Sequence, residues 1–146
     1  MSQQAGTVRA MSDAFVERAV AAPAEKVWNV LRDFGSVGWI PGAGQVDVEG
    51  EGPGMRRHIH GSGGPPVVER LISSDDGTRT IEYTIDANNP LPVSSYFGRV
   101  TILDDGAGSR IRWSADFEPA GDPAEAEAVI PLMLDALSGW LADACA

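Results

Sequence analysis

Hydrophobic and polar residues alternate along most of the chain, which predicts β-strands. The first alternating stretch covers residues 14–20, where Ala14, Val16 and Val20 share one side. Six more follow, and they are separated by turn-forming pairs such as Asp-Gly and Asn-Pro. These strands are expected at residues 45–49, 55–60, 67–73, 79–86, 92–103 and 109–118. Strands spaced by about ten residues, with turns between them, indicate one antiparallel meander.

Two segments have helical spacing of apolar residues instead. Between Val27 and Phe34 the apolar positions follow a helical period, Gly35 ends the helix, and a second short helical turn is expected at residues 36–40. Near the C-terminus, Asp122 is a candidate N-cap, and an apolar stripe continues from there to Leu141. The sequence therefore predicts two short helices after the first strand and one long C-terminal helix.

This order of elements predicts an α+β fold. A strongly bent, seven-stranded antiparallel sheet must bury one apolar face, and only the C-terminal helix is long enough to cover it. A sheet bent around that helix leaves room for a cavity between them. Residues 1–11 are expected to form a loose N-terminus, and residues 12–146 a single domain.

Composition narrows the classes of partner. The net charge of −10 argues against nucleic acid or an anionic membrane as partner, because both favour excess Lys and Arg. Cys145 is the only cysteine, which excludes an intramolecular disulfide and a cysteine-based zinc site. The sequence has no apolar run of the signal-peptide type and none long enough to span a membrane. We therefore expect a cytoplasmic protein without membrane insertion.

Several sequence strings, in this order, resemble one known group of proteins. They are APAEKVWNVLRDFGSVGWIPG at 22–42, GPGMRR at 52–57, ERL at 69–71, YTI at 83–85, PLPVSSYFG at 90–98 and the ending RIRW…FEPAG. The chain resembles the START-like helix-grip (SRPBCC) superfamily, in particular bacterial polyketide cyclase/dehydrase-like proteins and, more distantly, plant abscisic acid receptors. Those receptors hold the ligand's carboxylate with a lysine, whereas Ile40 and Pro41 stand in that neighbourhood here. Abscisic acid is therefore not the expected ligand.

The resemblance implies an internal cavity that binds a small lipophilic molecule and opens near two loops. Matching the family places a gate loop at 61–66, which includes Gly63 and Pro65, and a latch loop at 87–92, which includes Asn89 and Pro90. Further residues are expected to line the cavity. These ligand-binding candidates are His58, His60, Glu69, Leu71, Tyr83, Ile85, Tyr96, Trp39, Met133 and Leu137.

Glu69 is the most informative of these candidates, because it lies on an otherwise apolar strand face between Val67 and Leu71. A buried carboxylate without a partner is costly, so Glu69 should pair with a base, bind water or take up a proton. It is thus either a general acid or base, or one half of an ion pair with an arginine or histidine on a neighbouring strand.

His58 and His60 share one side of their strand, and three roles are open to them. They could bind a metal together with Glu69, transfer protons to a ligand, or form a polar wall. A metal site is the least supported role, because no third His or Cys is available to complete the ligand set. A shift of one residue in the strand would instead turn both histidines outward and place Met55, Arg57 and Ile59 inside.

Two functions are considered for such a cavity, beside a third class in which the chain is a partner protein with a vestigial pocket. The first is to bind a small hydrophobic ligand that is lipid-, aromatic- or polyketide-like. The second is a polyketide cyclase/dehydratase activity without a cofactor, in which Glu69, His60 and Tyr83 or Tyr96 move protons as catalytic residues. No cofactor-binding motif is present in the sequence. The protein is expected to be a monomer or a homodimer.

Overall fold

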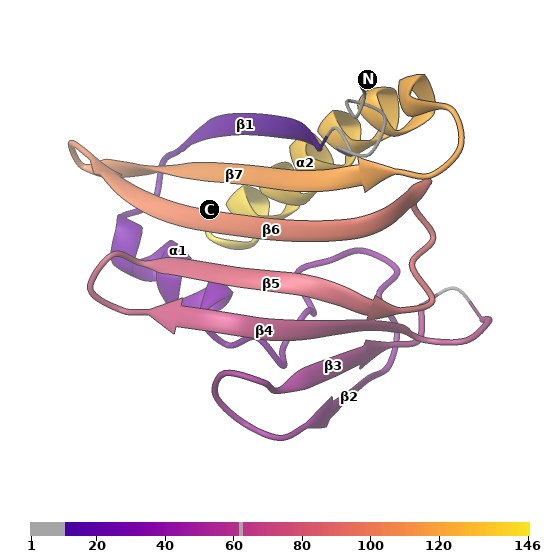
Figure 1. Ribbon diagram of the computed structural model, residues 1–146. Helices are drawn as coiled ribbons and strands as arrows, with labels where there is room; N and C mark the ends of the chain where they lie inside the picture. The colour runs from indigo at the N-terminus through magenta and orange to yellow at the C-terminus, as the bar shows by residue number, and fades with distance from the viewer. Residues whose placement is uncertain (1–10, 62) are drawn as a thin grey trace.

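The computed structural model describes residues 11–61 and 63–146, and its central feature is a seven-stranded antiparallel sheet. The strands lie in the order β1-β7-β6-β5-β4-β3-β2, so each strand after β1 pairs with its neighbour in sequence and β7 returns to pair with β1 (Figure 1). The strands are β1 (Ser12–Val20), β2 (Val46–Glu49), β3 (Arg56–Ile59), β4 (Val67–Asp75), β5 (Thr80–Ala87), β6 (Val93–Asp105) and β7 (Gly108–Pro119).

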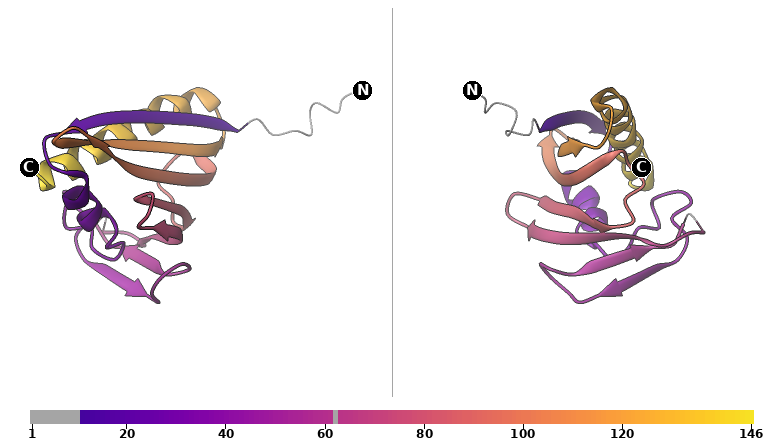
Figure 2. Two further views of the ribbon diagram at one scale, coloured as in Figure 1. Left: turned by 90° about the vertical axis from the view of Figure 1, so that its left-hand side faces the viewer. Right: turned by 45° about the vertical axis from the view of Figure 1, so that its right-hand side comes forward.

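Two helices cover the inner face of this sheet. Helix α1 (Ala24–Leu31) contacts β6 and β7, and the long helix α2 (Pro123–Ala144) contacts β1 and β7. In Figures 1 and 2 both helices lie on the same side of the sheet. The Asp122 side chain caps α2 by accepting a hydrogen bond from the Ala124 N–H at 3.0 Å. Helix α2 then buries one face against the sheet, through Ala126, Ile130, Leu134, Ser138 and Leu141.

The expected α+β helix-grip architecture is confirmed, including all seven strands and the long C-terminal helix. The second short helix expected at residues 36–40 is replaced by a series of turns between α1 and β2. In one of these turns the Ile40 N–H donates a hydrogen bond to the Val37 carbonyl at 2.9 Å. Phe34 and Trp39 of this segment contact the inner face of the sheet at Arg57 and Trp113. Apart from Met11, the loose terminus expected at residues 1–11 lies outside the described residues.

Candidate functional site

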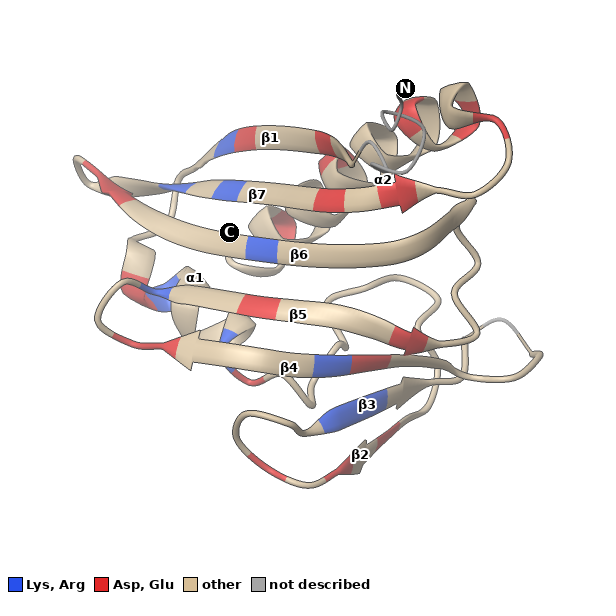
Figure 3. Ribbon diagram, in the orientation of Figure 1, with Lys and Arg blue, Asp and Glu red and all other residues tan. Residues whose placement is uncertain are grey.

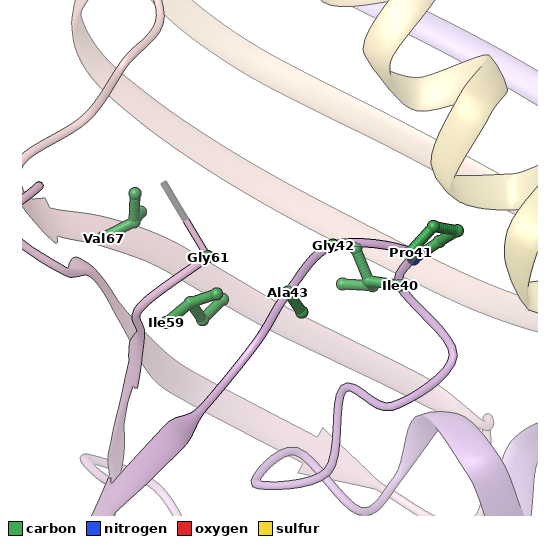
Figure 4. Close-up of a pocket in the computed structure, with 7 residues that line it drawn as sticks. All are labelled: Ile40, Pro41, Gly42, Ala43, Ile59, Gly61 and Val67. Carbon is green, nitrogen blue, oxygen red and sulfur yellow. The ribbon is translucent and has the colours of Figure 1, made fainter. Parts of the chain in front are cut away.

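An apolar pocket opens on the inner side of the sheet, next to the expected gate loop. Its volume is about 270 Å³, and it is shallow and open to solvent. Figure 4 shows Ile40 and Ile59 extending toward one another on either side of Ala43. The wall comes from the turn segment before β2, the end of β3 and the start of β4: Ile40, Pro41, Gly42, Ala43, Ile59, Gly61 and Val67.

The pocket exists because the turn segment packs directly on the end of β3. A Cβ at Gly61 would overlap the Gly42 carbonyl oxygen and lie 2.9 Å from the Ala43 carbonyl oxygen. Only glycine allows two backbone segments to approach this closely. The His60 N–H also donates to the Gln45 carbonyl at 2.9 Å, which continues the pairing of β2 and β3 to this point.

A buried ion pair lies in the next row of the sheet. Ile59 pairs in register with Val67, and Arg57 pairs with Glu69, so both pairs share the inner face. Arg57 Nε donates to Glu69 Oε1 at 2.8 Å, and its NH1 donates to the Phe34 carbonyl at 2.9 Å. The guanidinium also lies 3.9 Å above the Phe34 ring, a cation–π contact. Glu69 is therefore half of an ion pair with a neighbouring strand, the second of its two expected roles.

Further along the inner face, two tyrosines and a tryptophan form a hydrogen-bonded group that we call the tyrosine hub. It consists of Tyr83, Tyr96 and Trp113, which are all buried. Trp113 Nε1 donates to the Tyr83 hydroxyl at 3.1 Å, and the Tyr83 and Tyr96 hydroxyl oxygens lie 2.9 Å apart. The two tyrosines were named as cavity candidates from the sequence, and Trp113 was not named among them.

Gly98 provides the space for the hub. It pairs in register with Tyr83, and a Cβ at Gly98 would lie 2.5 Å from Tyr83 Cζ. Since cross-strand neighbours on one face are in contact, any larger residue would displace the Tyr83 ring. Gly98 therefore lets the Tyr83 ring lie flat across β6 so that its hydroxyl reaches Tyr96 and Trp113.

Both hub hydroxyls are held in the protonated form. Burial raises the pKa of Tyr83 to about 12, and the negative charge of Glu69 adds to this effect. Burial also raises the pKa of Tyr96 well above its ordinary value, with the neighbouring Tyr83 as the next cause. At neutral pH the hub therefore offers neutral hydroxyl groups, which can donate a hydrogen bond but are poor bases.

The prediction that His58 and His60 face the cavity is wrong. Both rings lie on the outer face, where His60 Nε2 is 2.9 Å from Asp47 Oδ2 and His58 Nε2 is 3.3 Å from Glu49 Oε1. The structure shows the alternative register of this strand, which is shifted by one residue, so that Arg57 is buried and the two histidines point outward. A usable signal was present, because alternation from Arg57 reaches the apolar residues Met55 and Ile59, both partly buried.

The remaining candidates lie on the inner side, with different degrees of burial. Leu71 is buried beside Tyr83 in the β4–β5 register. The Trp39 ring lies 6.3 Å from the Trp113 ring, which links the pocket's turn segment to the hub. Three more are partly buried against the core: Ile85, Met133 and Leu137. Binding by these residues stays a prediction.

The two expected loops are joined by a hydrogen bond. The Asn88 side-chain amide donates to the Pro66 carbonyl at 2.7 Å, from one loop to the other. Within the latch loop, the Asn89 side chain accepts a hydrogen bond from the Leu91 N–H at 2.9 Å, and Pro90 follows it directly. Gly63 has a φ of 77°, which suits a glycine, and Pro65 is exposed. A gating role for these loops stays a prediction.

The described residues contain neither a metal-binding cluster nor a membrane-spanning helix. Within residues 11–61 and 63–146, no three His, Cys, Asp or Glu side chains are grouped as metal ligands. No helix in this part of the chain is long and apolar enough to cross a membrane. Among the described residues of the inner face next to the pocket, the polar groups are the hydroxyl and indole groups of the hub and the Arg57–Glu69 ion pair.

Comparison with known proteins identifies the family. The model of the family described as "Polyketide cyclase / dehydrase and lipid transport" matches residues 11–143. The chain belongs to this family. MLP-like protein 423 from Arabidopsis thaliana is 32% identical to it over 116 residues, which are 70% of this chain and 74% of that protein.

Solved structures agree on the fold. The crystal structure of Ara h 8.0201 has a TM-score of 0.76 at 19% identity, and the alignment covers 93% of this chain and 98% of that one. Norcoclaurine synthase from Thalictrum flavum has a TM-score of 0.71 at 20% identity, covering 92% and 86%. The family and these structures support a ligand-binding helix-grip fold, as the resemblance implied.

Proposed function

We propose that this protein binds a small hydrophobic molecule, of lipid, aromatic or polyketide type, on the inner face of its sheet. The observation that carries the proposal is the apolar pocket of about 270 Å³ beside the gate loop. Small-molecule sites begin at about 300 Å³ and are lined mainly by apolar side chains with a few placed polar groups. The pocket is close to that size, and the ion pair and the hub supply polar groups on the same face.

The positions of the polar groups favour binding over proton transfer. The alternative activity as a cyclase/dehydratase needs Glu69, His60 and Tyr83 to act on one substrate. His60 lies on the outer face, and Glu69 is engaged by Arg57. Tyr83, with its pKa raised to about 12 by burial, keeps its proton at neutral pH. Norcoclaurine synthase is an enzyme on the same fold, but fold alone does not transfer its activity.

A pocket-filling variant tests the proposal. The neutral hydrocarbon 2-ethylnaphthalene serves as probe, and its binding is measured by equilibrium dialysis. We expect the native protein to bind it and Ile59→Trp to weaken binding at least about tenfold, because the new side chain occupies apolar contact area. The matched control is His58→Trp, which adds the same bulk to the outer face of the same strand.

The control should bind the probe as the native protein does. Absence of binding to the native protein would contradict the proposal. So would an equal loss in both variants, since that would indicate a general effect of bulk on β3. A thermal melt of each variant shows that the chain is folded during the measurement.

A further inference from the structure

We infer that the ligand is neutral, with an apolar body and a carbonyl or hydroxyl oxygen that accepts a hydrogen bond from the tyrosine hub. The inference rests on the proposed function and names the chemistry of its ligand. It excludes carboxylates and other anions as the preferred class. Three observations carry it: the hydrogen-bond balance of the hub, the charge balance of the inner face, and the position of the hub relative to the pocket.

The hub has one more donor than it can use. Trp113 Nε1, Tyr83 and Tyr96 together carry three polar hydrogens, and two hydrogen bonds join them. If Tyr83 donates to Tyr96, the Tyr96 proton is left over; if Tyr96 donates, the Tyr83 proton is left over. Among the residues that the structure describes, no other acceptor is bonded to either hydroxyl group.

Such a spare proton is costly when it is buried. Tyr83 and Tyr96 are only 2% and 3% exposed, so bulk water does not reach their hydroxyl groups freely. A buried donor without a partner loses its hydrogen bonds to water and gains none in exchange. An acceptor atom of a bound ligand provides the missing hydrogen bond. A hydrogen bond from the hub to a ligand oxygen therefore adds more to the binding free energy than one from an exposed hydroxyl group would.

The inner face is already balanced in charge. Arg57 is the one charged residue among the described buried residues, and its Nε and NH2 groups both lie within 2.8 Å of Glu69 Oε1. Its NH1 group is bonded to the Phe34 carbonyl. An incoming carboxylate would thus find no free cation and would be buried unpaired, which is strongly unfavourable.

Electrostatics at the hub point the same way. Burial is the main cause that raises the pKa values of Tyr83 and Tyr96, and the Glu69 charge raises both further. A site that resists negative charge on its own hydroxyl oxygen also resists it on a ligand oxygen placed there. A neutral carbonyl or hydroxyl oxygen has no such penalty.

The hub and the pocket lie on the same face of the sheet. Val67 lines the pocket, Glu69 is the next inward residue on β4, and Glu69 pairs with Ile85 on β5. Tyr96 lies one strand further, on β6. Two strand spacings of about 4.8 Å give about 10 Å across the sheet. A two-ring molecule with a carbonyl substituent can span that distance, with its rings at the pocket and its oxygen at the hub.

Three matched probes test the inference by equilibrium dialysis. They share a naphthalene body: 2-acetylnaphthalene carries a neutral acceptor, 2-ethylnaphthalene has no oxygen, and 2-naphthoate is an anion. We expect the native protein to bind the ketone about fivefold more tightly than the hydrocarbon, the gain of one net hydrogen bond. We expect 2-naphthoate to bind more weakly than either, because its charge has no partner.

A double variant, Tyr83→Phe with Tyr96→Phe, connects this preference to the hub. It removes both hydroxyl groups and keeps the rings, so the preference for the ketone should fall to about one while the hydrocarbon still binds. Thr84→Val is the matched control, because Thr84 gives up only its outward hydrogen bond to the Tyr96 backbone oxygen. It should keep the native preference.

Each outcome separates the inference from the proposed function. If the ethyl and acetyl probes bind equally, or naphthoate binds best, the inference is overturned and hydrophobic binding stands. If the double variant keeps the native preference, the tyrosine hub is not the donor and the inference is overturned. If no probe binds the native protein, the proposed function fails and the inference fails with it. Melting temperatures of all variants confirm that the proteins are folded.

Discussion

The two faces of strands β3 and β4 carry ion pairs of nearly the same geometry in different surroundings. On the inner face, Arg57 Nε is 2.8 Å from Glu69 Oε1, and the two side chains are 8% and 15% exposed. On the outer face, Arg56 and Arg70 place their Nε atoms 3.0 and 2.9 Å from Asp86 Oδ2. The arginine side chains there are 42% and 37% exposed.

The difference is one of solvent rather than distance. Figure 3 shows basic and acidic residues on neighbouring strands across this part of the sheet. Pairs in contact with water gain little, because water screens each charge and also solvates it when the partner is lost. A buried charge whose partner is removed has no such replacement. Loss of a partner should therefore destabilise the fold strongly at the inner pair and only slightly at the outer pairs.

The largest expected effect comes from breaking the inner pair. Glu69→Gln keeps the side-chain shape and leaves the Arg57 charge without its partner, so we expect a loss of about 3 kcal/mol in the free energy of unfolding. Urea titration measures it. Replacing both residues by leucine should recover most of the loss. A loss below about 1 kcal/mol for Glu69→Gln would contradict the buried position of this pair.

The second largest effect is expected at high pH, where ionisation of the hub should lower the free energy of unfolding. The folded-state pKa of Tyr83, about 12, lies above the ordinary value of 10.0, so the folded protein holds this proton more tightly. Stability from this group is fully present below pH 10 and is lost as pH rises toward 12, by about 2 to 3 kcal/mol.

Tyrosinate absorbance follows this titration directly, because the chain has only two tyrosines and both belong to the hub. We expect little tyrosinate at pH 10 and a rise that coincides with unfolding, as recorded by circular dichroism. Ordinary titration of both tyrosines near pH 10 in the folded protein would show that the hub is open to solvent.

Gly98→Ala should have a smaller effect at the same place. The new Cβ would lie 2.8 Å from the Tyr83 hydroxyl oxygen and closer to its ring, so the ring must move. Overpacking of this kind costs about 2 kcal/mol. The melting temperature and urea midpoint measure the loss. Adding Tyr83→Leu should make the cost of Gly98→Ala much smaller, and strict additivity of the two changes would argue against the overlap.

The smallest effect is expected on the outer face. Burial raises the pKa of Asp86, but hydrogen bonds from Arg70 and Arg56 outweigh it and place the pKa below the ordinary 3.8. Asp86→Asn should therefore cost less than about 1 kcal/mol at neutral pH. A lowered pKa stabilises above the unfolded value and loses that effect as pH falls through the folded one.

Acid titration of the Asp86→Asn variant checks the sign. The difference in unfolding free energy between native protein and variant should be constant near neutral pH and shrink below about pH 4. A loss at neutral pH as large as that of Glu69→Gln would remove the contrast between the two faces. Added salt should reduce the effect of Asp86→Asn more than that of Glu69→Gln.

Most of the fold could be predicted from the sequence, because its signals are local. Strand alternation, turn dipeptides and the N-cap at Asp122 each depend on residues within a few positions, and the structure confirms the elements they predict. The inward direction of Glu69, Tyr83 and Tyr96 also follows from alternation on strands with a clear apolar face.

The β3 strand was harder because both of its faces carry polar residues. Alternation places His58 and His60 together, and Arg57 with Met55 and Ile59, but the family match favoured the histidines as the inner set. Which set is buried depends on what each meets across space. Arg57 finds Glu69 and the Phe34 carbonyl, whereas the histidines meet the carboxylates of Asp47 and Glu49.

The sequence by itself determined the order and type of the elements, since these depend on periodicity and turn chemistry that are written locally in the chain. Only the tertiary structure decided the site. The pocket joins Ile40 and Ala43 to Ile59 and Val67, and the hub joins Trp113 to Tyr83 across a space that Gly98 leaves open. Such contacts depend on packing between residues that are distant in the chain. A local sequence pattern therefore does not predict which hydrogen-bonding groups and charges find partners.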